Sequence, residues 1–325
     1  MTEHIRPLHA CRTIAMRFAR TASVIPLLAL ATGCHEDAAQ LTAPARPSVV
    51  NAQLSAASFA SMYALDLIAT AATGIAMNDA GDVIGTSYLD TGCGPFCLPP
   101  QQTVAWRGGN RIVLPAVPGF SGIALTGINA QGVIVGTGGV AGTTTHAATW
   151  TPSGASYAVR DLGALPGMSV TTAAGIDDQG RVVGWSSTGG AIPTAAAPYL
   201  WSPGTGMVNL AAQGYPNAMP MAISRGGTVA TTSGWYRLGT PSVVTPYPPP
   251  PSGFYGPTGA PVINDNGDQA LFLITNTSQG LRYLFRLPSG GAYQMLSSSP
   301  TGNLSRAGLG SINAALDVTG TVTST

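Results

Sequence analysis

The 325-residue sequence predicts an all-β protein built as a β-propeller, and three observations lead to this fold class. A short phrase with a Gly-containing turn recurs along the chain, an aromatic segment follows each copy, and the composition favours turns. There are 42 Gly and 26 Pro, whereas charged residues make up only 8%, so we expect short strands rather than helices. With 45% hydrophobic residues the chain can bury a core, which argues against disorder.

The recurring phrase is GINAQGVIVG at 127–136, with variants at 74–85, 175–184 and 222–231. Each copy predicts two short strands joined by a turn, in which an Asn, Asp or Ser starts the turn and a left-handed Gly closes it. Spacings of 40 to 53 residues with apolar alternation indicate propeller blades rather than helical repeats. The aligned glycines are Gly81, Gly132, Gly180, Gly227, Gly267 and, less clearly, Gly320.

Two more strands are predicted in each of the first five repeats. Aromatic third strands are expected at 103–107, 147–151, 198–202, 234–238 and 283–287, and fourth strands at 111–114, 157–162, 207–210, 242–245 and 293–296. Four strands form one blade, and blades must stack around an axis to bury their aromatic residues between neighbours. The prediction is therefore a propeller of four-stranded blades, six or more in number.

Both ends of the repeat domain bear on how the ring is completed. Residues 62–67 resemble the fourth strand at 157–162, so we expect the N-terminal strand to complete the last blade. The sixth repeat lacks an aromatic third strand. Either that blade is incomplete or the sequence is truncated, and the association hazard of an open edge favours a truncated last blade.

The N-terminal region predicts export. Residues 1–33 are interpreted as a lipoprotein signal peptide, because four Arg precede an apolar stretch at 23–32 that is too short to span a membrane. The segment ends in Leu30-Ala31-Thr32-Gly33-Cys34, which resembles a bacterial lipobox and predicts lipidation of Cys34. An ordinary signal peptide that contains a Cys is the competing interpretation.

The predicted domain organisation places the repeats behind a tether. Residues 34–61 are rich in Ala, Pro and Ser without a clear period, as in a flexible tether, and residues 62–325 form the propeller repeat domain. His35 follows the lipobox where Asp would favour inner-membrane retention, so the outer membrane is the expected location, facing the periplasm or the cell surface.

A resemblance to a known repeat family supports this picture. Repeat two carries His146-Ala147-Ala148-Thr149-Trp150 and then Asp161-Leu162-Gly163, which is similar to the HAF-type extracellular repeat, named for a His-Ala-Phe triplet. The similarity covers roughly 62–322 and weakens in repeats four and five, where the His is absent. The resemblance implies an exported bacterial protein with propeller-like repeats, and no common activity.

No catalytic, cofactor-binding or metal-binding residues are predicted. Outside the leader and tether, His146 is the only histidine, and a structural role is expected for it. The Asp pairs in the turns do not follow a calcium-loop pattern, although calcium stays open. These pairs are Asp79 with Asp82, Asp177 with Asp178, and Asp265 with Asp268.

Two other features were assigned from composition. Cys93 and Cys97 stand in a loop of an exported protein, which favours a local disulfide; a zinc or redox site is the alternative, but the spacing does not match either. The proline-rich stretch at 247–257, with Tyr247, Phe254 and Tyr255, is interpreted as a stiff connector or, alternatively, a recognition surface.

Charge excludes one class of partner. From Cys34 onward there are 10 Arg against 12 Asp plus Glu, a net charge of −2, and no basic cluster. A protein that neutralises phosphates needs such a cluster, so nucleic acid is not an expected partner.

The leading functional hypothesis is a non-catalytic, lipid-anchored binding module of the cell envelope. Its partner would be a protein or glycan, and its only contact with the membrane would be the anchor. The alternative is a propeller hydrolase or lyase acting on polysaccharide through residues such as Asp178, Arg181 and Arg225. A third hypothesis is a purely architectural surface protein.

Overall fold

The computed structural model describes side chains in residues 72–88, 100–139, 144–189, 195–241, 244–276 and 281–296. It also gives the backbone of five strands outside these ranges: β1 (Arg12–Phe18), β2 (Leu30–Gly33), β3 (Leu65–Ala69), β24 (Gly308–Ile312) and β25 (Val318–Thr321). The described part is all β apart from one short 3₁₀ helix, η1 (Ala211–Gln213).

Five antiparallel four-stranded sheets, numbered here in chain order, correspond to the first five predicted repeats. Their strands follow one another in each sheet, and one parallel bridge between Thr145 and Val170 joins sheets 2 and 3. Sheet 1 consists of β4 (Ala72–Met77), β5 (Val83–Tyr88), β6 (Gln101–Arg107) and β7 (Asn110–Val113). Sheet 2 consists of β8 (Gly122–Ile128), β9 (Ile134–Gly139), β10 (Thr145–Ser153) and β11 (Ser156–Asp161).

Sheets 3 to 5 repeat this order, with short outer strands in sheets 4 and 5. Their strands are β12 (Val170–Ile176), β13 (Val182–Ser187), β14 (Ala196–Ser202), β15 (Gly206–Asn209); β16 (Pro220–Ile223), β17 (Thr228–Thr231), β18 (Gly234–Arg237), β19 (Thr245–Pro246); and β20 (Phe254–Ile263), β21 (Gln269–Thr275), β22 (Arg282–Leu287), β23 (Gln294–Met295). The predicted four-strand repeat is thus confirmed, although β19 overlaps only the end of the expected strand at 242–245.

The two ends differ from expectation. β3 pairs with β1, in a sheet of order β2-β1-β3, and does not complete the last repeat; β24 pairs with β25 alone among the described strands. The other two strands of this sheet, β1 and β2, lie within residues 1–33, the predicted signal peptide. Gly320 lies inside β25 rather than in the turn, so its alignment with the other glycines was wrong.

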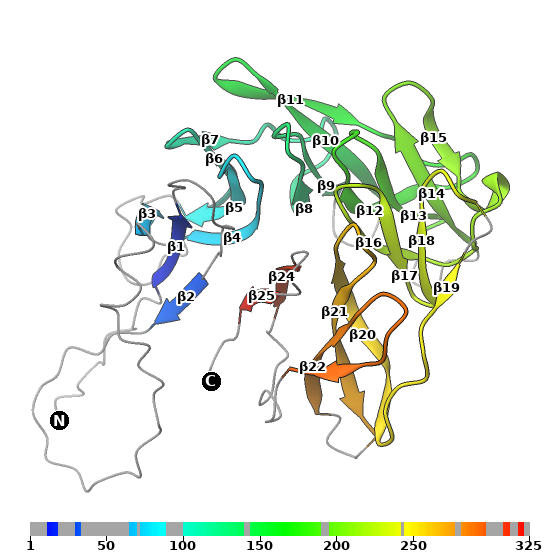
Figure 1. The fold of residues 1–325 in the computed structure, drawn as a ribbon. Helices are drawn as coiled ribbons and strands as arrows, with labels where there is room; N and C mark the ends of the chain where they lie inside the picture. The colour runs from blue at the N-terminus through cyan, green and yellow to red at the C-terminus, as the bar shows by residue number, and fades with distance from the viewer. Residues whose placement is uncertain are drawn as a thin grey trace, which may run out of the picture.

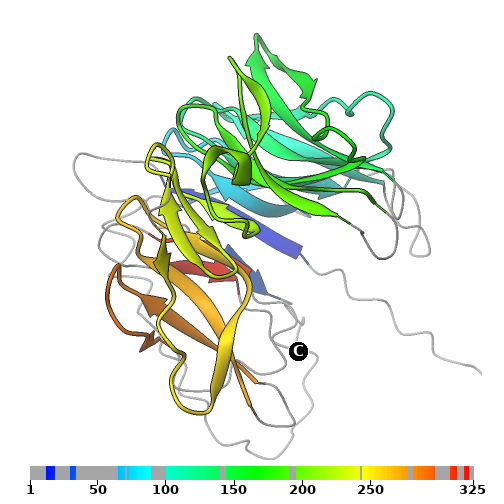
Figure 2. The same cartoon turned by 90° about the vertical axis from the view of Figure 1, so that its right-hand side faces the viewer.

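The sheets succeed one another side by side. The first strands of sheets 1 to 5 are in contact in chain order, and β24 continues the series beside β20. The ribbon follows an arc from the cyan sheet 1 to the orange sheet 5 (Figure 1), and the same succession is visible after a quarter turn (Figure 2). No helix in the described residues is long and apolar enough to cross a membrane.

Aromatic residues of the third strands lie in the core, as predicted. Trp150 is fully buried in a cluster with Ile84 of sheet 1 and Ile134 of sheet 2, and its indole Nε1 donates to the carbonyl of Pro115 at 2.8 Å. A second cluster joins Val135 of sheet 2 to Trp201 of sheet 3. Since each cluster is shared by two sheets, neighbouring repeats bury the faces that a single sheet leaves exposed.

A second glycine in the phrase has a packing role that the turn does not explain. Gly85, Gly136 and Gly184 each lie opposite a β-bulge in the first strand of their sheet. A Cβ on any of the three would overlap a backbone carbonyl of that first strand. The bulge brings the two backbones together, so only Gly fits at this position.

We predict that Gly136→Ala lowers the free energy of unfolding by about 2–3 kcal/mol, because the added methyl must displace backbone of β8. Gly204→Ala is the matched control: a Cβ there meets nothing within 4 Å, and the expected change is within about 0.5 kcal/mol. Chemical denaturation of both variants measures the difference. Equal stability of the two variants would contradict the packing role.

Candidate functional site

Five hairpin turns, called here the turn cluster, occupy residues 78–82, 129–133, 177–181, 224–228 and 264–268. In each turn the first residue donates its N–H to the carbonyl of the fifth at 2.8–3.1 Å. The Gly at the fourth position donates to the carbonyl of the first at 3.0–3.1 Å, with φ between 76° and 89°. The predicted turn with its left-handed Gly is therefore confirmed in all five repeats.

The first side chain of each turn is buried and organises the turn. In the second turn Asn129 is 2% exposed, and its Oδ1 accepts the N–H groups of Gln131 at 3.1 Å and Val133 at 2.9 Å. Asp177 and Asn264 accept two backbone N–H groups of their own turns in the same way, whereas Ser224 accepts one. A short side chain with an oxygen acceptor is what this position requires.

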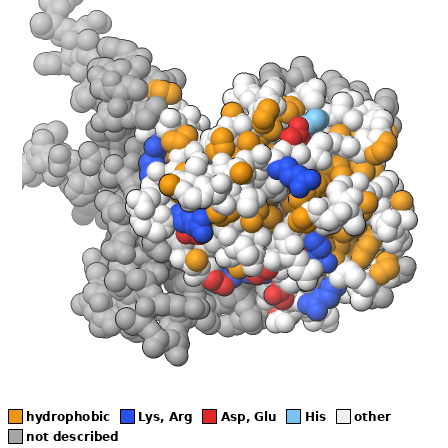
Figure 3. All heavy atoms as spheres, turned by 90° about the horizontal axis from the view of Figure 1, so that it is seen from above, with side chains coloured by type: hydrophobic (Ala, Val, Ile, Leu, Met, Phe, Trp, Pro, Cys, Tyr) orange, Lys and Arg blue, Asp and Glu red, His pale blue; other side chains and the backbone are white. Residues whose placement is uncertain are grey.

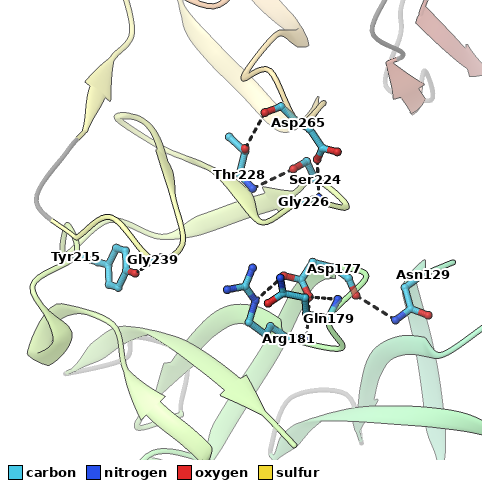
Figure 4. Close-up of polar contacts among 10 residues, drawn as sticks. All are labelled: Asn129, Asp177, Gln179, Arg181, Tyr215, Ser224, Gly226, Thr228, Gly239 and Asp265. Atoms are coloured by element: carbon cyan, nitrogen blue, oxygen red, sulfur yellow. Dashed lines mark hydrogen bonds and ion pairs between the residues drawn. The ribbon is translucent and has the colours of Figure 1, made fainter. Parts of the chain in front are cut away.

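Hydrogen bonds also connect each turn to the next. Asn78 donates through Nδ2 to the carbonyl of Asn129 at 3.1 Å, and Asn129 donates in turn to the carbonyl of Asp177 at 3.1 Å. The third and fourth turns are joined by the N–H of Asp178, which donates to the carbonyl of Arg225 at 2.9 Å. Figure 4 shows the side chains of the second to fifth turns gathered at one place.

Carboxylates on the turns reinforce these connections. Asp178 accepts the N–H of Ala130 in the preceding turn at 2.8 Å, and Asp265 accepts the N–H of Gly226 in its preceding turn at 2.5 Å. Arg225 forms an ion pair with Asp79, which links the fourth turn to the first. The turns of repeats one to four therefore make contacts both along the series and across it.

Arg181 is used inside its own turn. Its Nε donates to Oδ2 of Asp177 at 2.6 Å, and the Asp177 side chain is fully buried. Two backbone N–H groups and a guanidinium thus donate to this buried carboxylate, as a buried charge requires. Arg107 lies 3.7 Å from Asp82 in a looser pair in the first repeat.

The structure thus places the three residues of the enzymatic hypothesis close together but in structural contacts. Asp178 and Arg225 meet through a backbone hydrogen bond, and the charged group of each is engaged with a different turn. Arg181 faces Asp177. The sequence carried no signal for the pair of Arg225 with Asp79, because the two residues are 146 positions apart.

Carboxylates of the Asp pairs considered for calcium also accept hydrogen bonds from other groups of the protein. Asp82 accepts from Nδ2 of Asn78 at 3.2 Å, and Asp268 accepts from Nδ2 of Asn264 at 2.9 Å and from the N–H of Ser289 at 2.8 Å. Among the side chains that the structure describes, no group of three or more His, Cys, Asp or Glu could hold a metal ion.

His146 pairs with the Asp of the motif in its own repeat. Its Nδ1 lies 3.0 and 2.9 Å from the two carboxylate oxygens of Asp161, and Asp161 Oδ1 accepts the N–H of Gly163 at 2.8 Å. Leu162 between them is buried, and its N–H donates to the carbonyl of Ala147 at 2.9 Å. These contacts give the resembled motif a structural role at the edge of sheet 2.

The remaining predicted sites have different outcomes. Cys34, Cys93 and Cys97 lie outside the described residues. In the proline-rich stretch Tyr247 is largely enclosed, Phe254 packs edge-on against Phe285 with ring centroids 5.1 Å apart, and Tyr255 is 62% exposed. Only Tyr255 of these three presents an open aromatic surface.

Charged side chains form no patch of one sign on the face shown from above. Blue and red side chains are interspersed there, with hydrophobic groups between them (Figure 3). This distribution agrees with the near-neutral composition and offers no footprint for a polyanion on that face.

No protein-family model matches the chain, and no curated protein matches it significantly. The structure is similar to the crystal structure of TolB from Acinetobacter baumannii, with 16% identity and a TM-score of 0.44 over 71% of this chain; it spans 56% of that chain. A gluconolactonase from Xanthomonas campestris is similar at 10% identity and a TM-score of 0.39, over 69% of this chain and 75% of that one.

We predict that Asn129→Asp destabilises the chain by about 2–4 kcal/mol at neutral pH. The carboxylate keeps the two acceptor contacts inside the turn, but it loses the donor to Asp177 and introduces a buried charge. Thermal and chemical unfolding would measure the effect.

Asn110→Asp is the matched control, because Asn110 is exposed and its amide makes only a 3.4 Å contact with Gly108. We expect this change to leave stability within about 0.5 kcal/mol. A similar small effect at Asn129 would show that the bonds between turns do not stabilise the fold.

Proposed function

We propose that the chain is a non-catalytic interaction module of the bacterial cell envelope, built on a propeller of six or more blades. One observation supports this proposal: Asp178, Asp265 and the Arg225–Asp79 pair in the turn cluster connect different turns to one another. A binding module needs a rigid scaffold, and the five four-stranded sheets supply one. Its partner is a protein or glycan of the envelope.

Catalysis by acid and base requires a group that is available to move a proton in the bound substrate. In the turn cluster Asp178 accepts a backbone N–H, Asp177 is buried against Arg181, and Asp79 pairs with Arg225. Proton transfer by these groups would break the contacts that join the repeats. The hydrolase or lyase alternative is therefore the less favoured one.

Export and attachment to the outer membrane are part of the same proposal. Cleavage before Cys34 and lipidation of its thiol would place the repeats outside the cytoplasm, held at the outer membrane by residues 34–61. An anchor with more than one acyl chain is sufficient for stable attachment. Closure of the sheets into a ring is supported by the succession of their first strands, each beside the next.

We predict that the purified chain releases no new reducing ends and no unsaturated products from bacterial polysaccharides. Asp178→Asn should behave identically, since an amide oxygen keeps the contact with Ala130. Asp161→Asn, at the edge of sheet 2, is the matched control. Turnover by the wild type that disappears in Asp178→Asn and persists in Asp161→Asn would overturn the non-catalytic proposal.

Lipid attachment is predicted to depend on Cys34 alone. In a bacterial host fed a palmitate analogue, the wild-type chain should carry the label and fractionate with membranes, and Cys34→Ala should lose both. Cys11→Ala, which changes a leader residue, should keep them. Label that remains on Cys34→Ala would contradict the anchor.

A further inference from the structure

A groove with a volume of about 310 Å³ lies between sheets 4 and 5, and we call it the Trp235 groove. It falls in the two repeats where the resemblance to the HAF-type pattern is weakest. This size is at the lower end of the range for small-ligand sites. Its walls are formed by ten residues, among them Trp235, Thr245, Pro246, Tyr247, Leu287 and Pro288.

The lining of the groove is uncharged. None of its ten residues carries an ionisable group except Tyr247, and burial is the main cause that raises the pKa of Tyr247, so its hydroxyl stays protonated at neutral pH. A site without charge does not compensate the desolvation of a charged ligand. The groove therefore matches a neutral ligand.

One wall of the groove contains the indole ring of Trp235, which packs against a turn. Trp235 is half-buried, and its six-membered ring lies against Gly267 of the fifth turn, where a Cβ would come within 2.8 Å of two ring carbons. The fifth turn therefore packs against one side of this ring. A preorganised indole beside proline rings is a stacking surface that loses little conformational entropy when a ligand binds.

Polar groups without internal partners stand beside this surface. Within the described part of the chain, neither the Trp235 indole N–H nor the Thr245 hydroxyl makes a hydrogen bond. Behind Tyr247, the Gln269 side chain is fully buried, its Oε1 lies 2.9 Å from the Tyr247 hydroxyl, and its Nε2 has no described partner.

Reversing the Gln269 amide does not satisfy it. The Tyr247 hydroxyl has one proton and also lies 3.1 Å from the carbonyl of Thr231. If the hydroxyl donates there, it accepts from the Gln269 amide nitrogen, and the amide oxygen becomes the atom without a described partner. Either orientation leaves one atom of the buried Gln269 amide without a described hydrogen-bond partner, next to Tyr247 of the groove wall.

We propose that the Trp235 groove binds a neutral oligosaccharide. A sugar ring has an apolar C–H face that stacks on an indole and a rim of hydroxyls that both donate and accept hydrogen bonds. The groove offers a stacking ring, a donor in the indole N–H, and a group of either kind in the Thr245 hydroxyl. A proline-rich peptide would also use the ring and accept from the indole N–H, but proline has no N–H to donate to the Thr245 hydroxyl oxygen, whereas a sugar hydroxyl both donates and accepts. This inference rests on the proposed interaction function and names its ligand class.

The test is binding of the purified full chain to an array of neutral glucose-, galactose-, mannose- and N-acetylglucosamine-based oligosaccharides, followed by calorimetric titration of the best binder. We expect Trp235→Ala to weaken binding at least tenfold and Trp235→Phe, which keeps a ring but loses the N–H, to weaken it severalfold. Trp185→Ala is the matched control, since Trp185 is also half-buried but lies outside the groove, and it should bind within twofold of the wild type.

A second variant distinguishes loss of binding from loss of the folded structure. Thr245→Val removes only the hydroxyl, and we expect it to weaken binding while circular dichroism and the melting temperature stay unchanged. Absence of binding to every neutral saccharide, binding unaffected by Trp235→Ala and Thr245→Val, or a proline decapeptide that occupies the groove instead would each overturn the proposal.

Recovery of the saccharide separates this inference from the proposed function. Intact saccharide after prolonged incubation supports both. Shortened saccharide would contradict the non-catalytic proposal, while the dependence on Trp235 would still support the groove. Failure of all sugars to bind, with no turnover, would overturn the groove alone.

Discussion

The fold depends on a requirement of buried polar groups: each must find a hydrogen-bond partner. The first side chain of every turn in the cluster is buried, so it satisfies the N–H groups of its own turn and, in Asn78 and Asn129, donates to the next turn as well. One residue type thereby both shapes a hairpin and joins two repeats. Hydrophobic contacts such as those of Trp150 then fill the space between the joined sheets.

This requirement explains why a chain with few charged residues places several of them in one region. Asp178 and Asp265 accept N–H groups from neighbouring turns, and Arg225 reaches the first turn through Asp79. Their charges are stabilised by the contacts that they make, which leaves them poorly suited to proton transfer. In the described structure these side chains join the turns of different repeats to one another.

The proposed binding groove lies in repeats four and five, which depart from the pattern of the others. Their outer strands β19 and β23 are only two residues long. A run of prolines at 248–251 follows β19. Both residues of β19 and the prolines Pro248 and Pro249 line the Trp235 groove.

The sequence by itself determined the local structure: the turns with Gly81 to Gly267, the four strands of each of the first five repeats and the burial of residues such as Trp150 follow from short-range patterns. Only the tertiary structure decided the bonds between turns, the ion pair of Arg225 with Asp79, the pairing of β3 with β1 and the groove beside Trp235. The reason is physical. A turn or strand is specified by residues a few positions apart, whereas these contacts join residues from different repeats, and their partners are set by how whole sheets pack.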